Sequence, residues 1–285
     1  MTQSVRPRPS KQWRLSDAHL LGAWGAVLVS FLLSTAWLVF RGPAGAWQWL
    51  DCAFVFLVAL MSMCSMARRM PVQNVVSAAL VILGISSVVI ATFAYYASDE
   101  TRKIGFQNFE PFVLKSNRSN LLPGRLPFLV LALALSSRET ARLILRPWRR
   151  DKNYGLWLMV LGAGLVTATT LVIEPFANGV AGWWKWLPDS QTAESWHGTP
   201  WWAFLCWFLL SLTVYWFAGP WFVVKRPPLV VPDLTPLGVW GLILAYFTIG
   251  NVWGNFSAAE IKGKLWTAIL AAVIVAVPVA FMAWR

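Results

Sequence analysis

Apolar residues run along most of the chain in stretches of about 20 residues, separated by polar or basic segments. That is the length a helix needs to cross the hydrocarbon core of a bilayer. The stretches lack the period-2 alternation of a membrane barrel, and lipid cannot satisfy the free backbone groups of irregular chain. The pattern therefore predicts eight spanning helices, at residues 18–40, 47–66, 74–97, 127–147, 154–174, 200–222, 234–255 and 265–284.

Composition supports a membrane protein. Of the 285 residues, 58% are hydrophobic and only 13% are charged, too few charges to cover the outside of a soluble domain of this size. The predicted fold class is all-α, a polytopic integral membrane bundle. We expect one transmembrane domain over residues 16–285, preceded by a disordered basic cytoplasmic tail at residues 1–15.

Basic residues fall mainly in alternate connections, and this pattern predicts the orientation. The connections that we place in the cytoplasm carry Arg68, Arg69, Arg146, Arg149, Arg150, Lys152, Lys225 and Arg226. Both termini are then cytoplasmic, and two long loops, at about 98–126 and 175–199, face outward. The first of these loops carries five basic residues, but long loops follow the rule less strictly.

The placement of the charges and the few residues able to bind a metal exclude several classes of function. The basic residues behind the formal net charge of +12 lie mainly between the spans, where membrane topology explains them, so we expect no nucleic-acid partner. Cys52, Cys64 and Cys206 lie in apolar segments without a C-x-x-C pair, and His19 and His197 are the only imidazoles. We therefore expect no metal and no cofactor.

The segment LVIEPFANGVAGWWKWLPDS, residues 171–190, places a carboxylate at the outer end of an apolar run and follows it with tryptophans. One interpretation is a helix end with an interfacial aromatic anchor. The other is a catalytic acid, because burial at that boundary favours neutral Glu174, which can donate a proton. Two further acids are expected on the same side, Asp51 and Glu110, with solvated surface carboxylates as the alternative.

The fourth predicted span carries Arg138 and Glu139, with Arg142 close behind them. Glu139 and Arg142 are three positions apart and can pair on one helix face. Charges inside a membrane usually face protein or a water-filled cavity. The alternative is that this part of the helix already lies at the cytoplasmic interface.

Residues from about 160 to 217 resemble the second half of the carotenoid biosynthesis family that includes the bacterioruberin-type and γ-carotene hydratases. That family has Asp-Pro-x-Ala, spaced tryptophans, Gly-x-Pro and Asn-Phe-Leu-Gly-Trp. Here Glu174-Pro175-Phe176-Ala177 replaces the first motif, and the remaining matches are Trp184, Trp186, Gly198, Pro200, Phe204, Leu205 and Trp207. Glu174, Ala203 and Cys206 depart from the family's Asp, Asn and Gly, and the first-half motif is not clearly present.

The resemblance implies hydration of a terminal carbon–carbon double bond of an acyclic carotenoid without a cofactor. Glu174 would protonate the alkene, indoles would stabilise the cation, and Asp51 or Glu110 would orient water. The expected substrate-binding residues are Pro175, Trp183, Trp184, Trp186, Gly198, Pro200, Trp202, Phe204 and Trp207. The alternatives are a non-catalytic subunit that binds carotenoid or lipid within a larger complex, and a small-molecule transporter. The expected partners are a polyisoprenoid and membrane lipids, in a bacterial cytoplasmic membrane.

Overall fold

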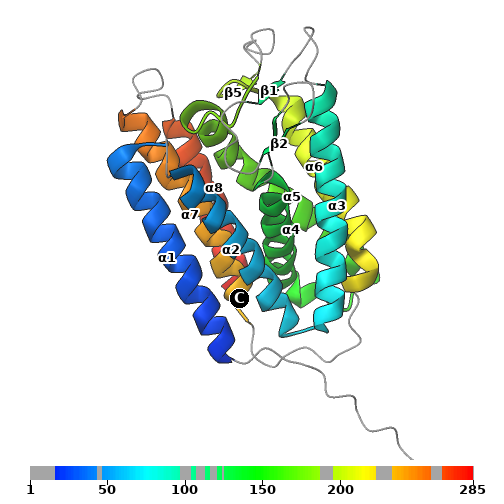
Figure 1. Ribbon diagram of the computed structural model, residues 1–285. Coiled ribbons are helices and arrows are strands. Elements are labelled where there is room, and N and C mark those ends of the chain that lie inside the picture. Colours follow the sequence, from blue (N-terminus) through cyan, green and yellow to red (C-terminus); the bar gives the residue numbers. More distant parts are fainter. Residues whose placement is uncertain are drawn as a thin grey trace, which may run out of the picture.

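The computed structural model in Figure 1 describes residues 17–43, 47–96, 104–106, 113–115, 121–123, 125–186, 195–222, 233–257 and 265–284. The predicted tail at 1–15 and the candidate acid Glu110 lie outside these residues. Side chains at 17–18, 93–96, 104–106, 113–115, 121–123 and 185–186 are also not described, although their backbone is.

The described chain contains eight long helices, and each begins and ends within three residues of a predicted span. They are α1 Asp17–Arg41, α2 Trp47–Ala67, α3 Val72–Tyr96, α4 Arg125–Ile144, α5 Tyr154–Pro175, α6 Trp201–Phe222, α7 Thr235–Ser257 and α8 Trp266–Trp284. Seven of them, all except α4, are long and apolar enough to cross a membrane. The chain is thus a helical bundle and a multi-pass membrane protein, as predicted.

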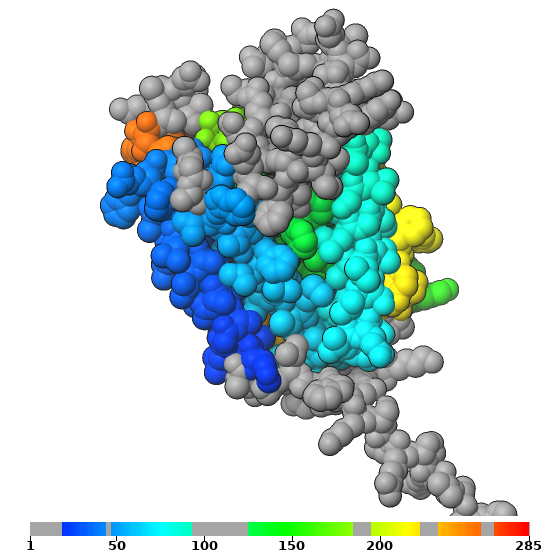
Figure 2. Space-filling view, in the orientation of Figure 1, coloured from blue at the N-terminus to red at the C-terminus, as the bar shows by residue number. Residues whose placement is uncertain are grey.

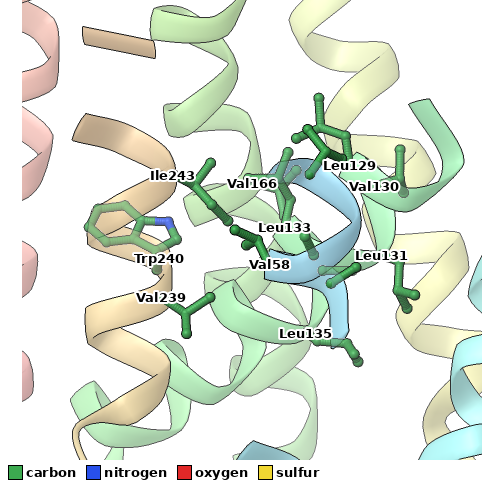
Figure 3. Packing of buried hydrophobic residues seen from close by; sticks show 14 of the residues in the cluster. Val58, Leu129, Val130, Leu131, Leu133, Leu135, Val166, Val239, Trp240 and Ile243 are labelled. Atoms are coloured by element: carbon green, nitrogen blue, oxygen red, sulfur yellow. The ribbon is translucent and has the colours of Figure 1, made fainter. Parts of the chain in front are cut away.

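Helix α4 is the centre of the bundle. Figure 1 shows α4 and α5 between a group formed by α1, α2, α7 and α8 and a pair formed by α3 and α6. Of the 20 residues of α4, 17 are buried. Figure 3 shows Leu129 and Leu133 of α4 on the side of Val58 of α2, Val166 of α5 and Ile243 of α7, and Leu131 pointing away from them. Because α4 is covered by protein, it does not need the apolar surface of a helix that faces lipid.

The lipid-facing helices surround this core. The exposed large side chains of α1, α3, α6 and α8 are almost all apolar, for example Phe40, Leu80, Trp216 and Val277. Figure 2 shows α1, α2 and α3 side by side on one face of the molecule. Exposed apolar surface on every outer helix is expected where the surrounding solvent is lipid.

Short strands join the connections at one end of the bundle. Strand β1, Ile104–Phe106, pairs antiparallel with β4, Trp184–Trp186, so that Ile104 lies opposite Trp186. The two long loops that the sequence predicts on the outer side therefore meet. Two hairpins complete this end, β2 Val113–Lys115 with β3 Leu121–Pro123, and β5 Ser195–Trp196 with β6 Thr199–Pro200.

Gly250 of α7 makes room for a ring of the neighbouring segment. A Cβ added at Gly250 would overlap the Phe176 ring, which is fully buried and enclosed by other aromatic rings. We expect Gly250→Ala to lower the free energy of unfolding by about 2–3 kcal/mol, because overpacking forces the ring or α7 to move.

Unfolding in detergent micelles would measure this effect, with Gly241→Ala as the matched control on the same helix. An added Cβ at Gly241 meets nothing within 4 Å. The free energy of unfolding of this control should stay within about 1 kcal/mol of that of the wild type. Equal stability of the two variants would contradict the packing argument.

Candidate functional site

The last turn of α5 is broken by Pro175, which has no N–H to donate to the carbonyl of Leu171. The indole of Trp196 replaces that donor, with Nε1 at 2.9 Å from the Leu171 carbonyl oxygen. The next carbonyl, of Val172, accepts a hydrogen bond from Asn251 Nδ2 at 2.8 Å. A five-residue π-helical turn, η2 Phe176–Val180, follows. The Glu-Pro pair thus ends the helix at a place where side chains from elsewhere satisfy its free carbonyls.

The β5–β6 hairpin folds back over this helix end. Its two turn residues, His197 and Gly198, both have positive φ, at 51° and 82°, as two-residue hairpin turns favour. The His197 carbonyl accepts from Asn178 Nδ2 at 3.1 Å, and its imidazole Nε2 lies 2.8 Å from Thr267 Oγ1. Burial lowers the pKa of His197, which keeps the imidazole neutral near pH 7. The hairpin places Thr199 against α5.

Glu174 is buried, with 1% of its surface exposed, and three donors from separate parts of the chain contact it. Trp184 Nε1 lies 3.0 Å and Thr199 Oγ1 lies 3.1 Å from Oε2, and Trp207 Nε1 lies 2.9 Å from Oε1. These donors come from β4, β6 and α6. The carboxyl group therefore connects β4, β6 and α6 to the end of α5.

Only one of these three partners can exchange a proton with Glu174. An indole N–H donates and cannot accept, whereas a hydroxyl does both. If Glu174 is protonated on Oε2, the Thr199 hydroxyl can rotate so that its oxygen accepts a hydrogen bond from that proton. Trp184 and Trp207 instead fix the position of the carboxyl group. The arrangement is suited to a positioned acid that can pass its proton to the Thr199 hydroxyl.

A cluster of aromatic rings lies next to Trp184, one of the donors to Glu174. Phe176 is at the centre, with ring centroids 5.9 Å from Trp47, 5.5 Å from Trp183, 6.3 Å from Tyr246 and 5.4 Å from Phe247. Trp183 in turn lies 5.9 Å from Trp184, which binds Glu174. The indole nitrogens of Trp47 and Trp183 are buried without an acceptor among the described residues. This cluster therefore has two indole donors that could bind an acceptor from outside the described residues.

A second buried carboxylate, Asp51 of α2, lies at the same end of the bundle. It forms an ion pair with Arg125, the first residue of α4, and both side chains are almost fully buried. Tyr246 Oη of α7 donates to Asp51 Oδ1 at 2.9 Å, and Ser34 Oγ lies 2.7 Å from Tyr246 Oη. The Arg125 guanidinium lies 4.4 Å over the Trp183 ring. Asp51 is thus linked to the aromatic cluster through Arg125 and Tyr246.

The remaining predicted site residues differ in their placement. Pro175 and Pro200 are buried beside Glu174 and Thr199, and Phe204 is 6% exposed. Trp202 is 40% exposed on α6. The side chain of Trp186 and the whole of Glu110 lie outside what the structure describes. Sequence reasoning did not identify Thr199, Arg125 or Tyr246 as site residues.

Arg138, Glu139 and Arg142 lie at the opposite end of α4. Glu139 Oε1 accepts from Arg138, and Oε2 accepts from Arg69 of the α2–α3 connection at 2.7 Å and from Arg142 at 3.3 Å. Arg69 also binds Asp233, with Nη2 at 3.2 Å from Oδ2. A transporter would predict a polar cavity around Glu139, whereas its described contacts are arginine side chains at a helix end.

No family model, no curated protein and no solved structure matches the chain in comparisons with known proteins. Among the described residues, no group of three or more His, Cys, Asp or Glu side chains could hold a metal ion. The interpretation of the site therefore depends on the geometry around Glu174 and Asp51.

Proposed function

We propose that the chain is a membrane enzyme that adds water across a terminal carbon–carbon double bond of an acyclic carotenoid. The observation that carries the proposal is the buried Glu174 carboxyl group, fixed by two indole donors and linked to one hydroxyl, beside a cluster of aromatic rings. Such a group can deliver a proton in a setting that excludes bulk water, which is what protonation of an alkene needs.

The proposed reaction begins with proton transfer from the neutral Glu174 carboxyl group, directly or through Thr199 Oγ1, to the terminal alkene carbon. The double bond's electron pair forms the new C–H bond and leaves a tertiary carbocation. The oxygen of a water molecule then bonds to the cation, and one proton of that water returns to Glu174. The sum is alkene plus water giving a tertiary alcohol, with no oxidation and no cofactor.

The aromatic cluster supports this chemistry by its capacity to hold positive charge. Indole faces attract cations, and the Arg125 guanidinium already lies 4.4 Å over the ring of Trp183. The indole N–H groups of Trp47 and Trp183 would bind the oxygen of the incoming water. In this proposal Asp51 keeps Arg125 and Tyr246 in place at the edge of the cluster.

Expression in a bacterial host that makes acyclic carotenoids tests the proposal. We expect the extracted pigments to gain about 18 mass units, one water, when the wild-type chain is present. Cells with the empty vector provide the background. Pigments of unchanged mass in every host tried, with the protein folded and in the membrane, would exclude a hydratase of these substrates.

A non-catalytic subunit that binds carotenoid or lipid is the second candidate. The observation in its favour is that three donors already bind Glu174, as expected of a carboxylate that only holds the helix end and the hairpin together. In the same experiment this function predicts pigments of unchanged mass that co-purify with the protein.

We further infer eight crossings of a bacterial cytoplasmic membrane, with both termini in the cytoplasm. The four arginines around Glu139 and Asp233, together with Arg146, Arg149 and Arg150, lie at one end of the bundle, where α2–α3 and α4–α5 connect (Figure 1). That asymmetry is what the positive-inside rule requires.

Reporter fusions measure this orientation. Alkaline phosphatase, which is active only outside the cytoplasm, should be inactive when fused after Arg285 and active when inserted after Trp186. The reverse pattern would invert the proposed topology.

A further inference from the structure

The basic cluster at the inner end of α4 contains more positive charge than its acids neutralise. Four arginines, Arg68, Arg69, Arg138 and Arg142, accompany two carboxylates, Glu139 and Asp233, in the described part of this region. Two positive charges are therefore in excess. Buried or half-buried cations normally require a partner, because their desolvation is costly.

The shortage of acceptors lies on the side of α4 that faces α5 and α6. On the other side, Arg69 binds both Glu139 and Asp233 and also donates to the Asp233 carbonyl oxygen at 3.0 Å. Arg138 and Arg142, in contrast, have only Glu139 as a described acceptor. A guanidinium carries five N–H donors, and the Arg138 side chain is only 11% exposed. Most donors of Arg138 are thus left without a described acceptor, although most of the side chain is buried.

Two further features limit what could bind there. The Tyr154 hydroxyl, at the start of α5, is buried without a hydrogen-bond partner among the described residues, and it is close enough to Arg138 to interact electrostatically. The Arg138 guanidinium lies 4.1 Å over the Phe222 ring at the end of α6, so one of its faces is already covered. The free donors of Arg138, Arg142 and Tyr154 together fit a compact group with several acceptor oxygens and a negative charge.

The surface beside these residues is suited to lipid. Trp148, Leu156 and Trp157, at the same end of α4 and α5, are each more than half exposed. Aromatic and aliphatic side chains at this depth lie along acyl chains and headgroups. Basic pockets between helices at the cytoplasmic side bind anionic headgroups in membrane proteins.

We propose that Arg138, Arg142 and Tyr154 form a binding site for the phosphate group of an anionic phospholipid between the inner ends of α4, α5 and α6. The phosphate oxygens accept from the two guanidiniums and the tyrosine hydroxyl, and the acyl chains lie along the exposed start of α5. The site is distant in the fold from Glu174 and does not depend on the function proposed for that residue.

The test uses the full-length chain in detergent, delipidated, with phosphatidylglycerol, phosphatidylcholine or inorganic phosphate added. Native mass spectrometry counts bound lipid, and thermal unfolding reports stabilisation. We expect phosphatidylglycerol to remain bound at one site and to raise the unfolding temperature, and phosphatidylcholine to do neither. Equal stabilisation by inorganic phosphate would overturn the assignment to a lipid.

Tyr154→Phe is the decisive variant, because it removes a hydroxyl that has no described partner in the protein and should leave the fold intact. We expect it to weaken phosphatidylglycerol binding about tenfold, the loss of one hydrogen bond to a charged group. Arg142→Gln should weaken binding at least as much. Arg150→Gln, the same change at an exposed arginine nearby, is the matched control. Binding by Tyr154→Phe equal to that of the wild type, with Arg142→Gln no worse than Arg150→Gln, would refute the site.

Discussion

Glu174→Gln is expected to abolish the 18-unit gain in pigment mass, because an amide cannot supply the proton that the proposed hydration requires. The loss should be at least 100-fold, since general acid catalysis contributes about 10²–10⁴-fold. Mass analysis of pigments from cells with equal amounts of wild-type and variant protein measures it. The variant also turns an acceptor oxygen into an N–H₂ group facing an indole N–H, so its stability must be measured in parallel.

Variants of Thr199 test whether Glu174 transfers a proton through this hydroxyl or has a purely structural role. Thr199→Val keeps the side-chain shape and removes the hydroxyl that contacts Oε2, and Thr199→Ser restores it. Trp207→Phe removes a donor to Oε1 that cannot carry a proton. Both Thr199→Val and Trp207→Phe should cost about 1 kcal/mol of stability, as one hydrogen bond does.

If Thr199 relays the proton, Thr199→Val loses far more hydration than Trp207→Phe, and Thr199→Ser retains it. Full activity of Thr199→Val would remove the hydroxyl from the mechanism and leave direct transfer from Glu174. Loss of activity in proportion to stability in all three variants would favour a structural role for the carboxyl group.

The helices were predictable because the length and polarity of each span are fixed by the bilayer, and this constraint is local in the sequence. The largest difference is at α4, which begins at Arg125 and ends at Ile144 instead of covering 127–147. The predicted span at 127–147 leaves Arg125 in the preceding loop, and an arginine is costly at membrane depth. In the fold its charge is matched by Asp51, 74 residues earlier, so the helix can begin with it.

The site was predictable only in part, because its hydrogen bonds join residues far apart in the chain. The Glu-Pro pair and its tryptophans indicated where a buried acid would lie. Which indoles would reach Glu174 depended on how the hairpin folds back, and that brings Thr199 and Trp207 to the carboxyl group. Asp51 carried a usable signal, since a carboxylate in an apolar helix needs a cation or donor, but Arg125 and Tyr246 could not be singled out by spacing.

Helix α4 joins both polar regions of the protein. Arg125 at its N-terminal end binds Asp51, and Glu139 near its C-terminal end binds arginines of α4 and of the α2–α3 connection. These charges are the reason why α4 is not counted among the apolar spans, although it lies at the centre of the bundle. A helix that is enclosed by others can carry charge at both ends, provided that each charge has a partner.

Asp51→Asn is expected to lower the free energy of unfolding by about 3–5 kcal/mol, because it leaves the Arg125 charge without its buried counter-ion. Asp51 is fully buried and Arg125 is 5% exposed, so water cannot replace the lost partner. Arg125→Met should lower the free energy of unfolding by a similar amount, because it leaves the Asp51 carboxylate without its counter-ion. It should also remove the guanidinium from the face of the Trp183 ring.

The double variant Asp51→Asn with Arg125→Met distinguishes this pairing from a general need for polar groups. Removing both charges eliminates the uncompensated ion, and replacement of a whole buried pair is often neutral. We therefore expect the double variant to be more stable than either single variant, by unfolding in mixed micelles. Additive losses would mean that Asp51 and Arg125 act separately, with Tyr246 as the partner that matters to Asp51.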